Sequence, residues 1–309
     1  MTTASGPNSS DATAKSVVVA GSSGFLGTHL AAGLRERGHR VTPLVRREPS
    51  AGQSRWDPSN GVVDASVIGE ADVVVNLAGA PLIGNPHSKK WARDLLQSRL
   101  ATTSTLADAI AAVAEPPALV NGSGISWYGD HGAVELTETS DTRGHALLTR
   151  VCREWEAAAR PAQDAGARVV LLRTAPVQNG ANLPLKAQRL QFKAGLGGRM
   201  GGGDQHYPVI SLRDWVGATI FLIEHSSAAG PVNLCSPTTP TNAEFTRALA
   251  DLVHRPAIFA VPAPVLRLAA GAMAPEVLGS LNTRPALLLD LGYRFHHRDV
   301  RAVLTAGLA

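Results

Sequence analysis

Apolar and polar residues follow two different periods along this chain. Short runs of β-branched residues, such as Val17–Val19 and Val73–Val75, contain no polar side chain, which is typical of strands buried on both faces of a parallel sheet. Longer segments, such as 91–114 and 146–165, carry apolar residues at helical spacing. Strands and helices alternate in this way from about residue 16 to about residue 180, which predicts an α/β fold with a doubly wound parallel sheet.

The alternation of strands and helices ends near residue 180. Residues 181–207 are rich in glycine and basic side chains, and we expect an irregular lid loop there. Apolar helical stretches after residue 237 predict a smaller, mainly helical domain. The predicted divisions are a disordered tail at 1–14, a sheet domain at 15–180 completed by 208–236, the lid loop at 181–207 and a C-terminal domain at 237–309.

Three glycines follow the first predicted strand at three-residue spacing. Gly21 permits a sharp turn, Gly24 lets the backbone approach a pyrophosphate, and Gly27 lets the following helix pack closely on the sheet. Free N–H groups in the first turn of that helix attract phosphate. The spacing therefore predicts a dinucleotide site, although a tight turn without a ligand would need similar residues. The residues assigned to this site are Gly21, Ser23, Gly24, Phe25, Leu26 and Gly27.

Two further segments bear on the dinucleotide. Arg46 and Arg47 end the second predicted strand, where an acidic residue would bind a ribose 2′-hydroxyl and an arginine would instead neutralise a 2′-phosphate. This favours NADP(H) over NAD(H), and either arginine can be the one that faces the phosphate; two solvated surface arginines are the alternative. Leu77, Ala78 and Gly79 follow a buried strand and leave room for the same cofactor.

Composition and charge narrow the class of protein. The 309 residues include 44% apolar and 17% charged residues, and neither an apolar run long enough to span a membrane nor an apolar signal segment stands out. Cys152 and Cys235 lie far apart, so we expect no disulfide, no metal site and a cytoplasmic location. The net charge of +4 suits an acidic small molecule, and no aromatic residues are interleaved with the basic ones as in nucleic-acid-binding segments.

Several motifs, in this order, resemble the extended short-chain dehydrogenase/reductase superfamily. The motifs are Val17–Gly27, Asn76–Gly79, Trp127–Gly129, Leu172–Thr174 and Ser211–Asp214. A second set is similar to an atypical subgroup, the nucleoside-diphosphate-sugar epimerase-like proteins, which have a distinctive C-terminal domain. This set comprises Ser98–Arg99, Leu136–Glu138, Val151–Glu156, Gly195–Gly198 and Asn242–Phe245. The resemblance covers almost the whole chain after the tail.

The resemblance implies a Rossmann domain that binds NADP(H) and a smaller C-terminal substrate domain. It also implies hydride transfer at C4 of the nicotinamide, assisted by a serine, a tyrosine and a lysine four residues after that tyrosine. We assign Arg173, in one of the shared motifs, to the cofactor site.

The chain departs from this family at the catalytic pair. Leu148 and Cys152 stand at the tyrosine and lysine positions. Ser123 is the best match to the catalytic serine, and Tyr128 is a nearby phenol that could serve as an acid. Without an adjacent lysine we expect the pKa of Tyr128 near about 10, which suits a proton donor in carbonyl reduction better than a base. The alternatives are that Ser123 is a serine in the turn at the strand end and that Tyr128 is an aromatic residue packed beside the cofactor.

Three residues beyond the sheet domain are candidates for substrate contacts. Lys186 and Arg199 would hold an anionic group, or are simply solvated surface residues. Ser211 stands where relatives tend to carry a histidine.

The sequence thus predicts an NADP(H)-dependent reductase or epimerase-like enzyme for a small polar or nucleotide-linked sugar or carbonyl compound. The alternative is a non-catalytic NADP(H)-binding redox sensor, because the usual tyrosine and lysine are missing. We expect a small-molecule substrate, neither nucleic acid nor membrane as a partner, and leave a homodimer open.

Overall fold

A central sheet organises the part of the chain that the computed structural model describes, residues 13–309. Within these residues the sheet has eight strands, in the order β12-β8-β6-β5-β1-β2-β3-β4. Their bounds are β12 Gly230–Leu234, β8 Val169–Thr174, β6 Ala118–Gly124, β5 Val73–Asn76, β1 Ser16–Ala20, β2 Arg40–Val45, β3 Ser54–Asp57 and β4 Val62–Val63. All neighbours run parallel except β3 and β4. The tail predicted for residues 1–14 falls, up to residue 12, outside the described residues.

The order of the strands reverses direction at β1. From β1 the chain proceeds outward through β2 and β3, then returns to place β5 on the other side of β1 and continues through β6 and β8 to β12. Ligands of such sheets bind outside the carboxyl ends of the strands at this switch point. The fold therefore locates a crevice next to the glycine turn that follows β1.

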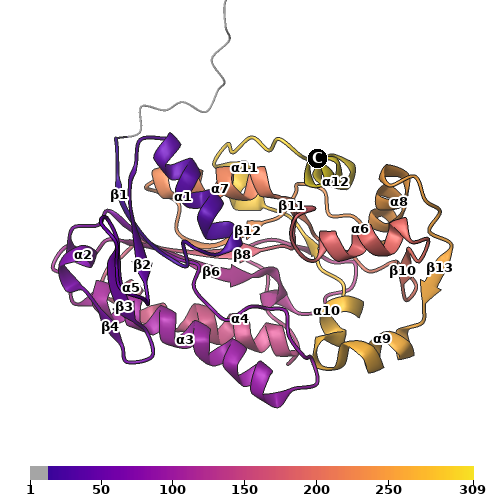
Figure 1. Cartoon of the computed structure of the whole chain (residues 1–309), viewed down its shortest axis with the longest axis horizontal. Helices are drawn as coiled ribbons and strands as arrows, with labels where there is room; N and C mark the ends of the chain where they lie inside the picture. The colour runs from indigo at the N-terminus through magenta and orange to yellow at the C-terminus, as the bar shows by residue number, and fades with distance from the viewer. Residues whose placement is uncertain (1–12) are drawn as a thin grey trace, which may run out of the picture.

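Helices cover both faces of the sheet (Figure 1). Val17 and Val19 pack on one side with residues of α1, α7 and α11, whereas Val18 packs on the other side with residues of α2, α3 and α5, as expected where successive side chains of a strand point to opposite faces. The bounds are α1 Phe25–Glu36, α7 Leu212–Glu224 and α11 Ala286–Asp290 on the first side, and α2 Ala65–Gly69, α3 Lys89–Ala111, α4 Leu147–Ala157 and α5 Arg160–Asp164 on the second.

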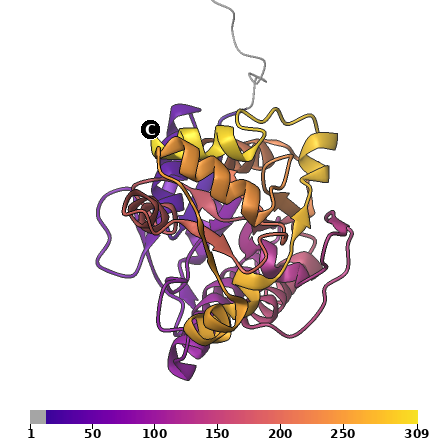
Figure 2. The same ribbon diagram turned by 90° about the vertical axis from the view of Figure 1, so that its right-hand side faces the viewer.

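The C-terminal third of the chain packs beside the carboxyl ends of the strands, and its orange and yellow segments face the viewer in Figure 2. A third core joins α6, α8 and α12. The elements of this part are α6 Leu185–Lys193, β10 Gly198–Met200, α8 Asn242–Leu252, β13 Phe259–Val261, α9 Ala263–Ala270, the 3-10 helix η2 Gly271–Met273, α10 Ala274–Leu278 and α12 Val300–Leu308. Short elements connect it to the sheet: the 3-10 helix η1 Ile125–Tyr128, β7 Glu135–Leu136, β9 Val177–Gln178, β11 Ile210–Ser211 and β14 Asn282–Thr283.

Three sequence predictions need correction. Residues 181–207 are not irregular: they contain α6 and β10, because Leu185 and Phe192 lie two helical turns apart and are buried in the third core. The single helix predicted at 146–165 is two helices, and Pro161, which has no N–H to continue a helix, lies in the first turn of the second. The boundary predicted at residue 237 does not separate the two cores either, since Leu288 packs in the core of the sheet domain.

Asp214 ties the C-terminal segment to the sheet domain. Its side chain is fully buried near the start of α7. Oδ1 accepts a hydrogen bond from the backbone N–H of His296 at 2.7 Å, and Oδ2 accepts one from the N–H of His297 at 2.9 Å and one from the Ser211 hydroxyl at 2.8 Å. One carboxylate thus satisfies donors that lie more than 80 residues away in sequence.

We expect Asp214→Ala to lower the free energy of unfolding by about 3 kcal/mol, because it leaves several buried donors without an acceptor. Urea unfolding measures the change. Asp251→Ala is the matched control, since Asp251 forms an exposed pair with Arg301 and should cost less than about 1 kcal/mol. Equal losses in the two variants would contradict this account of Asp214.

Candidate functional site

The glycine turn after β1 is as tight as its sequence predicts. Gly21 has a φ of +81°, a conformation that side chains rarely adopt. A Cβ atom on Gly27 would lie 2.1 Å from the carbonyl oxygen of Gly21, so only glycine lets α1 approach the turn this closely. Gly24 is the N-cap of α1 and provides no side-chain cap there. The N–H groups of Phe25 and Leu26, in the first turn, therefore remain available for an anion at the switch point.

The end of β5 forms the opposite wall of the crevice. A Cβ on Gly21 would lie 2.7 Å from the carbonyl carbon of Leu77, so the two strand ends are in direct contact. Gly79 is exposed, and Leu77 and Ala78 are half-buried. Arg99 of α3, which the sequence analysis left unassigned, supports this wall by donating to the Ala80 carbonyl oxygen at 3.1 Å.

The other residues assigned to the cofactor lie at two different depths. Ser23 is exposed in the turn, and Arg46 and Arg47 are exposed directly after β2, the strand beside β1. Arg47 donates to the carbonyl oxygen of its neighbour Glu48. These three side chains are exposed around the turn and the adjacent strand end, whereas the fourth, Arg173, is buried.

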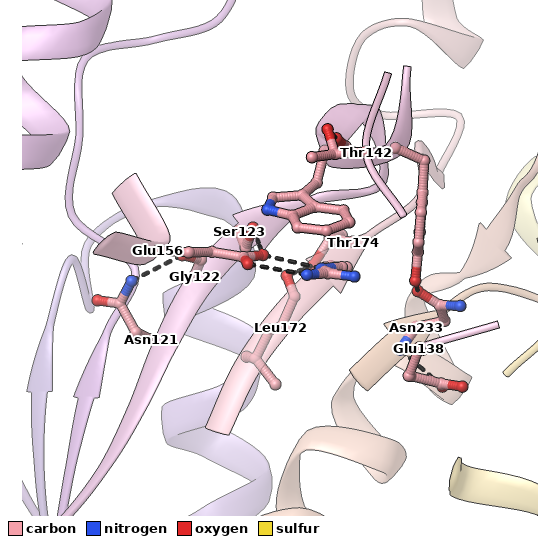
Figure 3. Close-up of polar contacts among 12 residues, drawn as sticks. Asn121, Gly122, Ser123, Glu138, Thr142, Glu156, Leu172, Thr174 and Asn233 are labelled. Atoms are coloured by element: carbon pink, nitrogen blue, oxygen red, sulfur yellow. Dashed lines mark hydrogen bonds and ion pairs between the residues drawn. The ribbon is translucent and has the colours of Figure 1, made fainter. Parts of the chain in front are cut away.

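Arg173 and Ser123 belong to a buried cluster around Glu156 of α4 (Figure 3). Nε and Nη2 of Arg173 each donate to a Glu156 carboxylate oxygen at 2.9 Å, and the Ser123 hydroxyl donates to Oε1 at 2.6 Å. The guanidinium also lies over the ring of Trp127, 3.5 Å from its centroid. Arg173 is only 3% exposed and Ser123 only 6%. Arg173 and Ser123 thus make their hydrogen bonds in the interior, and the Ser123 hydroxyl points to Glu156.

Tyr128 is packed as the alternative interpretation has it, and the ordinary pKa predicted for it is wrong. The side chain is fully buried, and its hydroxyl donates to Oδ1 of Asn233 at 2.8 Å. Burial raises the pKa of the phenol to about 12, above the ordinary value expected from the sequence. A phenol enclosed in this way has neither the access nor the acidity of a proton donor to substrate.

Leu148 and Cys152, which the resemblance sets at the family's tyrosine and lysine positions, cannot replace those two groups. Leu148 is apolar and 8% exposed. Burial raises the pKa of the Cys152 thiol to about 12, so the thiol is neutral near pH 7 and supplies no positive charge. A Cβ on Gly124, at the end of β6, would lie 3.0 Å from the Cys152 sulfur, which shows how closely the thiol packs on that strand.

The predicted substrate contacts do not meet at one place. Ser211 is 1% exposed and is the N-cap of α7, with its hydroxyl donating to Asp214 and accepting from the Asp214 N–H; it therefore acts in folding and has no hydroxyl turned toward a substrate. Lys186 and Arg199 are exposed, on α6 and β10. Neither lines the pocket described next.

A pocket of about 780 Å³ lies at the junction of the sheet domain and the C-terminal part. One wall is made by η1 and the start of α4, and the other by α9, η2 and α10. Arg143, His145 and Arg267 are exposed along it, whereas Ser126 and Glu276 are half-buried. The Ser126 hydroxyl donates to Oε2 of Glu276 at 2.5 Å across this junction. Sequence reasoning missed the pair because its members lie 150 residues apart.

Comparison with known proteins identifies the family of this chain. A profile of the NAD dependent epimerase/dehydratase family matches residues 17–235. The chain belongs to that family. Within it, residues 261–306 match a domain of unknown function, DUF1731, which covers α9 through most of α12.

Relatives in this family extend over nearly the whole chain. An epimerase family protein of Mycobacterium bovis is 38% identical over 290 residues, which are 93% of this chain and 96% of that protein. The crystal structure of the human epimerase family protein SDR39U1 with NADPH is 31% identical, has a TM-score of 0.84 and covers 94% of this chain and 98% of its own. A nucleoside-diphosphate sugar epimerase from Corynebacterium glutamicum is 32% identical, has a TM-score of 0.78 and covers 96% of this chain and 59% of its own.

These comparisons confirm the predicted family and the Rossmann-type fold class. The human structure contains the cofactor that the sequence predicts for this chain. Among residues 13–309, no group of three or more His, Cys, Asp or Glu side chains could hold a metal ion. In the same residues, no helix has both the length and the apolar character needed to cross a membrane.

We expect Glu156→Gln to destabilise the fold by about 3 kcal/mol, because it leaves the buried Arg173 guanidinium without a counter-charge. Chemical denaturation measures the loss. Glu154→Gln, two residues earlier on α4, removes an exposed pair with Arg150 and should cost less than about 0.5 kcal/mol. A Glu156→Gln variant as stable as this control would refute a structural role for the cluster.

Proposed function

We propose that this chain binds NADP(H) and is an atypical NADP(H)-dependent oxidoreductase or epimerase-like enzyme for a small polar or nucleotide-linked sugar or carbonyl compound. The observation that carries the proposal is the glycine turn at the switch point of the sheet, where the uncapped first turn of α1 meets the end of β5. This arrangement offers backbone N–H groups and a helix dipole to a pyrophosphate.

The preference for NADP(H) over NAD(H) rests on Arg46 and Arg47. Both are exposed next to the crevice, at the end of the strand where the adenosine ribose lies in Rossmann folds. An arginine there can form charge-assisted hydrogen bonds with a 2′-phosphate, which NAD(H) lacks. The NADPH in the human relative supports the same preference.

The pocket at the domain junction supports the proposed substrate class. Its volume of about 780 Å³ suits a small organic ligand. Ser126 and Glu276 offer hydrogen bonds at its inner wall, and Arg143 and Arg267 line its exposed part. These groups favour a polar compound with an anionic substituent, which the arginines would hold in place of the predicted Lys186 and Arg199.

Bound NADPH would supply a hydride from C4 of its nicotinamide. The protein's own contribution would be to hold the pyrophosphate at α1 and to enclose the substrate beside η1. Because Ser123 and Tyr128 are buried in the interior, a proton for the reaction has to come from another group.

A non-catalytic NADP(H) sensor is the alternative. The observation in its favour is that an apolar Leu148 and a neutral, buried Cys152 occupy the tyrosine and lysine positions. Oxidation of NADPH in the presence of a panel of carbonyl compounds separates the two functions, since a sensor would bind NADPH without consuming it.

Arg46→Ala and Arg47→Ala test the cofactor site. We expect the variant that removes the phosphate contact to weaken NADPH binding by roughly 10- to 100-fold while NADH binding stays unchanged, because only NADPH carries the 2′-phosphate. Titration by cofactor fluorescence measures both. Arg301→Ala, in an exposed pair on α12, is the control. Absence of binding of either nucleotide to the native chain would refute the proposed function.

A further inference from the structure

We propose that Glu276, held by Ser126, is the proton donor of this site and takes over the task of the tyrosine that the chain lacks. The inference rests on the proposed function and adds to it the acid that completes the reaction. Glu276 would be a catalytic residue in contact with substrate, and Ser126 a positioning residue.

The carboxyl of Glu276 lies beside the position of the missing tyrosine. Glu276 belongs to α10 of the C-terminal part, and its carboxyl accepts a hydrogen bond from the Ser126 hydroxyl. The backbone N–H of Leu148, the residue at the tyrosine position, also acts on this carboxyl and lowers its pKa. The C-terminal part thereby delivers an ionisable group to the first turn of α4, from which the family's tyrosine would project.

The Ser126–Glu276 pair also lies near the carboxyl ends of the strands, where ligands of such sheets bind. Ser126 lies in η1, which begins directly after the last residue of β6, Gly124. The carboxyl ends of β5 and β6 belong to the edge of the sheet at which ligands of such folds bind. Ser126 and Glu276 both line the pocket and are only half-buried, so a ligand can touch them. Ser123 and Tyr128 do not have this access.

The surroundings of Glu276 favour its protonated form. Burial raises the pKa of its carboxyl, and the Ser126 hydroxyl and the backbone N–H of Leu148 oppose that effect in part. The facing thiol of Cys152 on α4 is neutral because its pKa is about 12. The remaining charged or titratable groups of the pocket are Arg143, His145 and Asp130 from the loops around η1 and α4, and Arg267 from α9. A carboxyl that keeps its proton closer to neutral pH is an effective general acid.

The proposed step balances. In a reduction, the carbonyl carbon of the substrate accepts the hydride that NADPH provides, while the carbonyl oxygen takes the proton from Glu276. The C=O double bond becomes a single bond, the products are an alcohol and NADP⁺, and the Glu276 carboxylate regains a proton from water. In the reverse direction the carboxylate accepts the proton of the alcohol. The ligand class is therefore a carbonyl compound or the corresponding alcohol, small enough for the pocket.

The first test is single-turnover oxidation of NADPH with 4-carboxybenzaldehyde as the probe, followed across pH. For the native chain we expect the rate to fall as pH rises through the raised pKa of Glu276, because only the protonated carboxyl donates. Glu276→Gln should be at least about 100-fold slower and should lose this pH dependence. Ser126→Ala should shift the fall to higher pH, because the hydrogen bond that it removes stabilises the carboxylate.

Controls separate this inference from the proposed function. NADPH should bind equally well to the native chain and to Glu276→Gln, as measured by fluorescence. Glu135→Gln, which removes an exposed glutamate of β7, should leave the rate unchanged. If the native chain does not bind NADPH, the proposed function fails. If both forms bind NADPH and Glu276→Gln keeps the native rate and pH profile, only the assignment of Glu276 is refuted.

A second test requires neither cofactor nor substrate. In protein labelled with ¹³C at the glutamate side-chain carboxyl, the NMR resonance missing from Glu276→Gln belongs to this group. We expect it to titrate above the ordinary glutamate value of about 4.3, and to titrate still higher in Ser126→Ala. A resonance that titrates at or below the ordinary value, or that does not respond to Ser126→Ala, would overturn the proposal even where 4-carboxybenzaldehyde is not reduced.

Discussion

The buried ion pair between Glu156 and Arg173 holds helix α4 against the sheet, and the shape of the candidate site depends on it. Arg173 is the next-to-last residue of β8, and Ser123, which donates to the same carboxylate, is the next-to-last residue of β6. One carboxylate therefore joins a helix to two neighbouring strands close to their carboxyl ends. An ion pair in this position is costly to desolvate, so it is stable only while each charge keeps its partner. The start of α4, which forms one wall of the pocket, is fixed as a consequence.

The two residues that the sequence analysis considered for chemistry both make their hydrogen bonds in the interior. Ser123 donates inward to Glu156, and Tyr128 donates inward to Asn233. The positions of the tyrosine and lysine hold Leu148 and Cys152, which continue the apolar packing of α4. Neither side chain lines the pocket, where α4 contributes Thr149. The C-terminal part brings Glu276 to Ser126, so the proton donor that we propose would come from that part of the chain.

The family and the fold could be predicted from the sequence, whereas several helices after residue 146 could not. The continuous apolar runs of β1 and β5 correctly predicted a parallel sheet, and the three glycines correctly predicted the tight turn between β1 and α1. The same reasoning failed for residues 181–207, where Leu185 and Phe192 give α6 an apolar face too sparse to stand out among glycines and basic residues. It also passed over Pro161, which divides one predicted helix into α4 and α5.

The sequence by itself determined the features that depend on neighbouring residues. Strand and helix periods, and a turn that only glycine can form, are properties of the local backbone, so they can be read without knowing the rest of the chain. Only the tertiary structure decided which side chains face the pocket. A step of one residue along β6 moves a side chain to the opposite face, so Leu119 packs in the core beside α3 while Val120 packs in the core beside α7. Ser126 and Glu276 are 150 residues apart in the sequence. A contact between such distant residues forms only when the separate parts of the chain pack together.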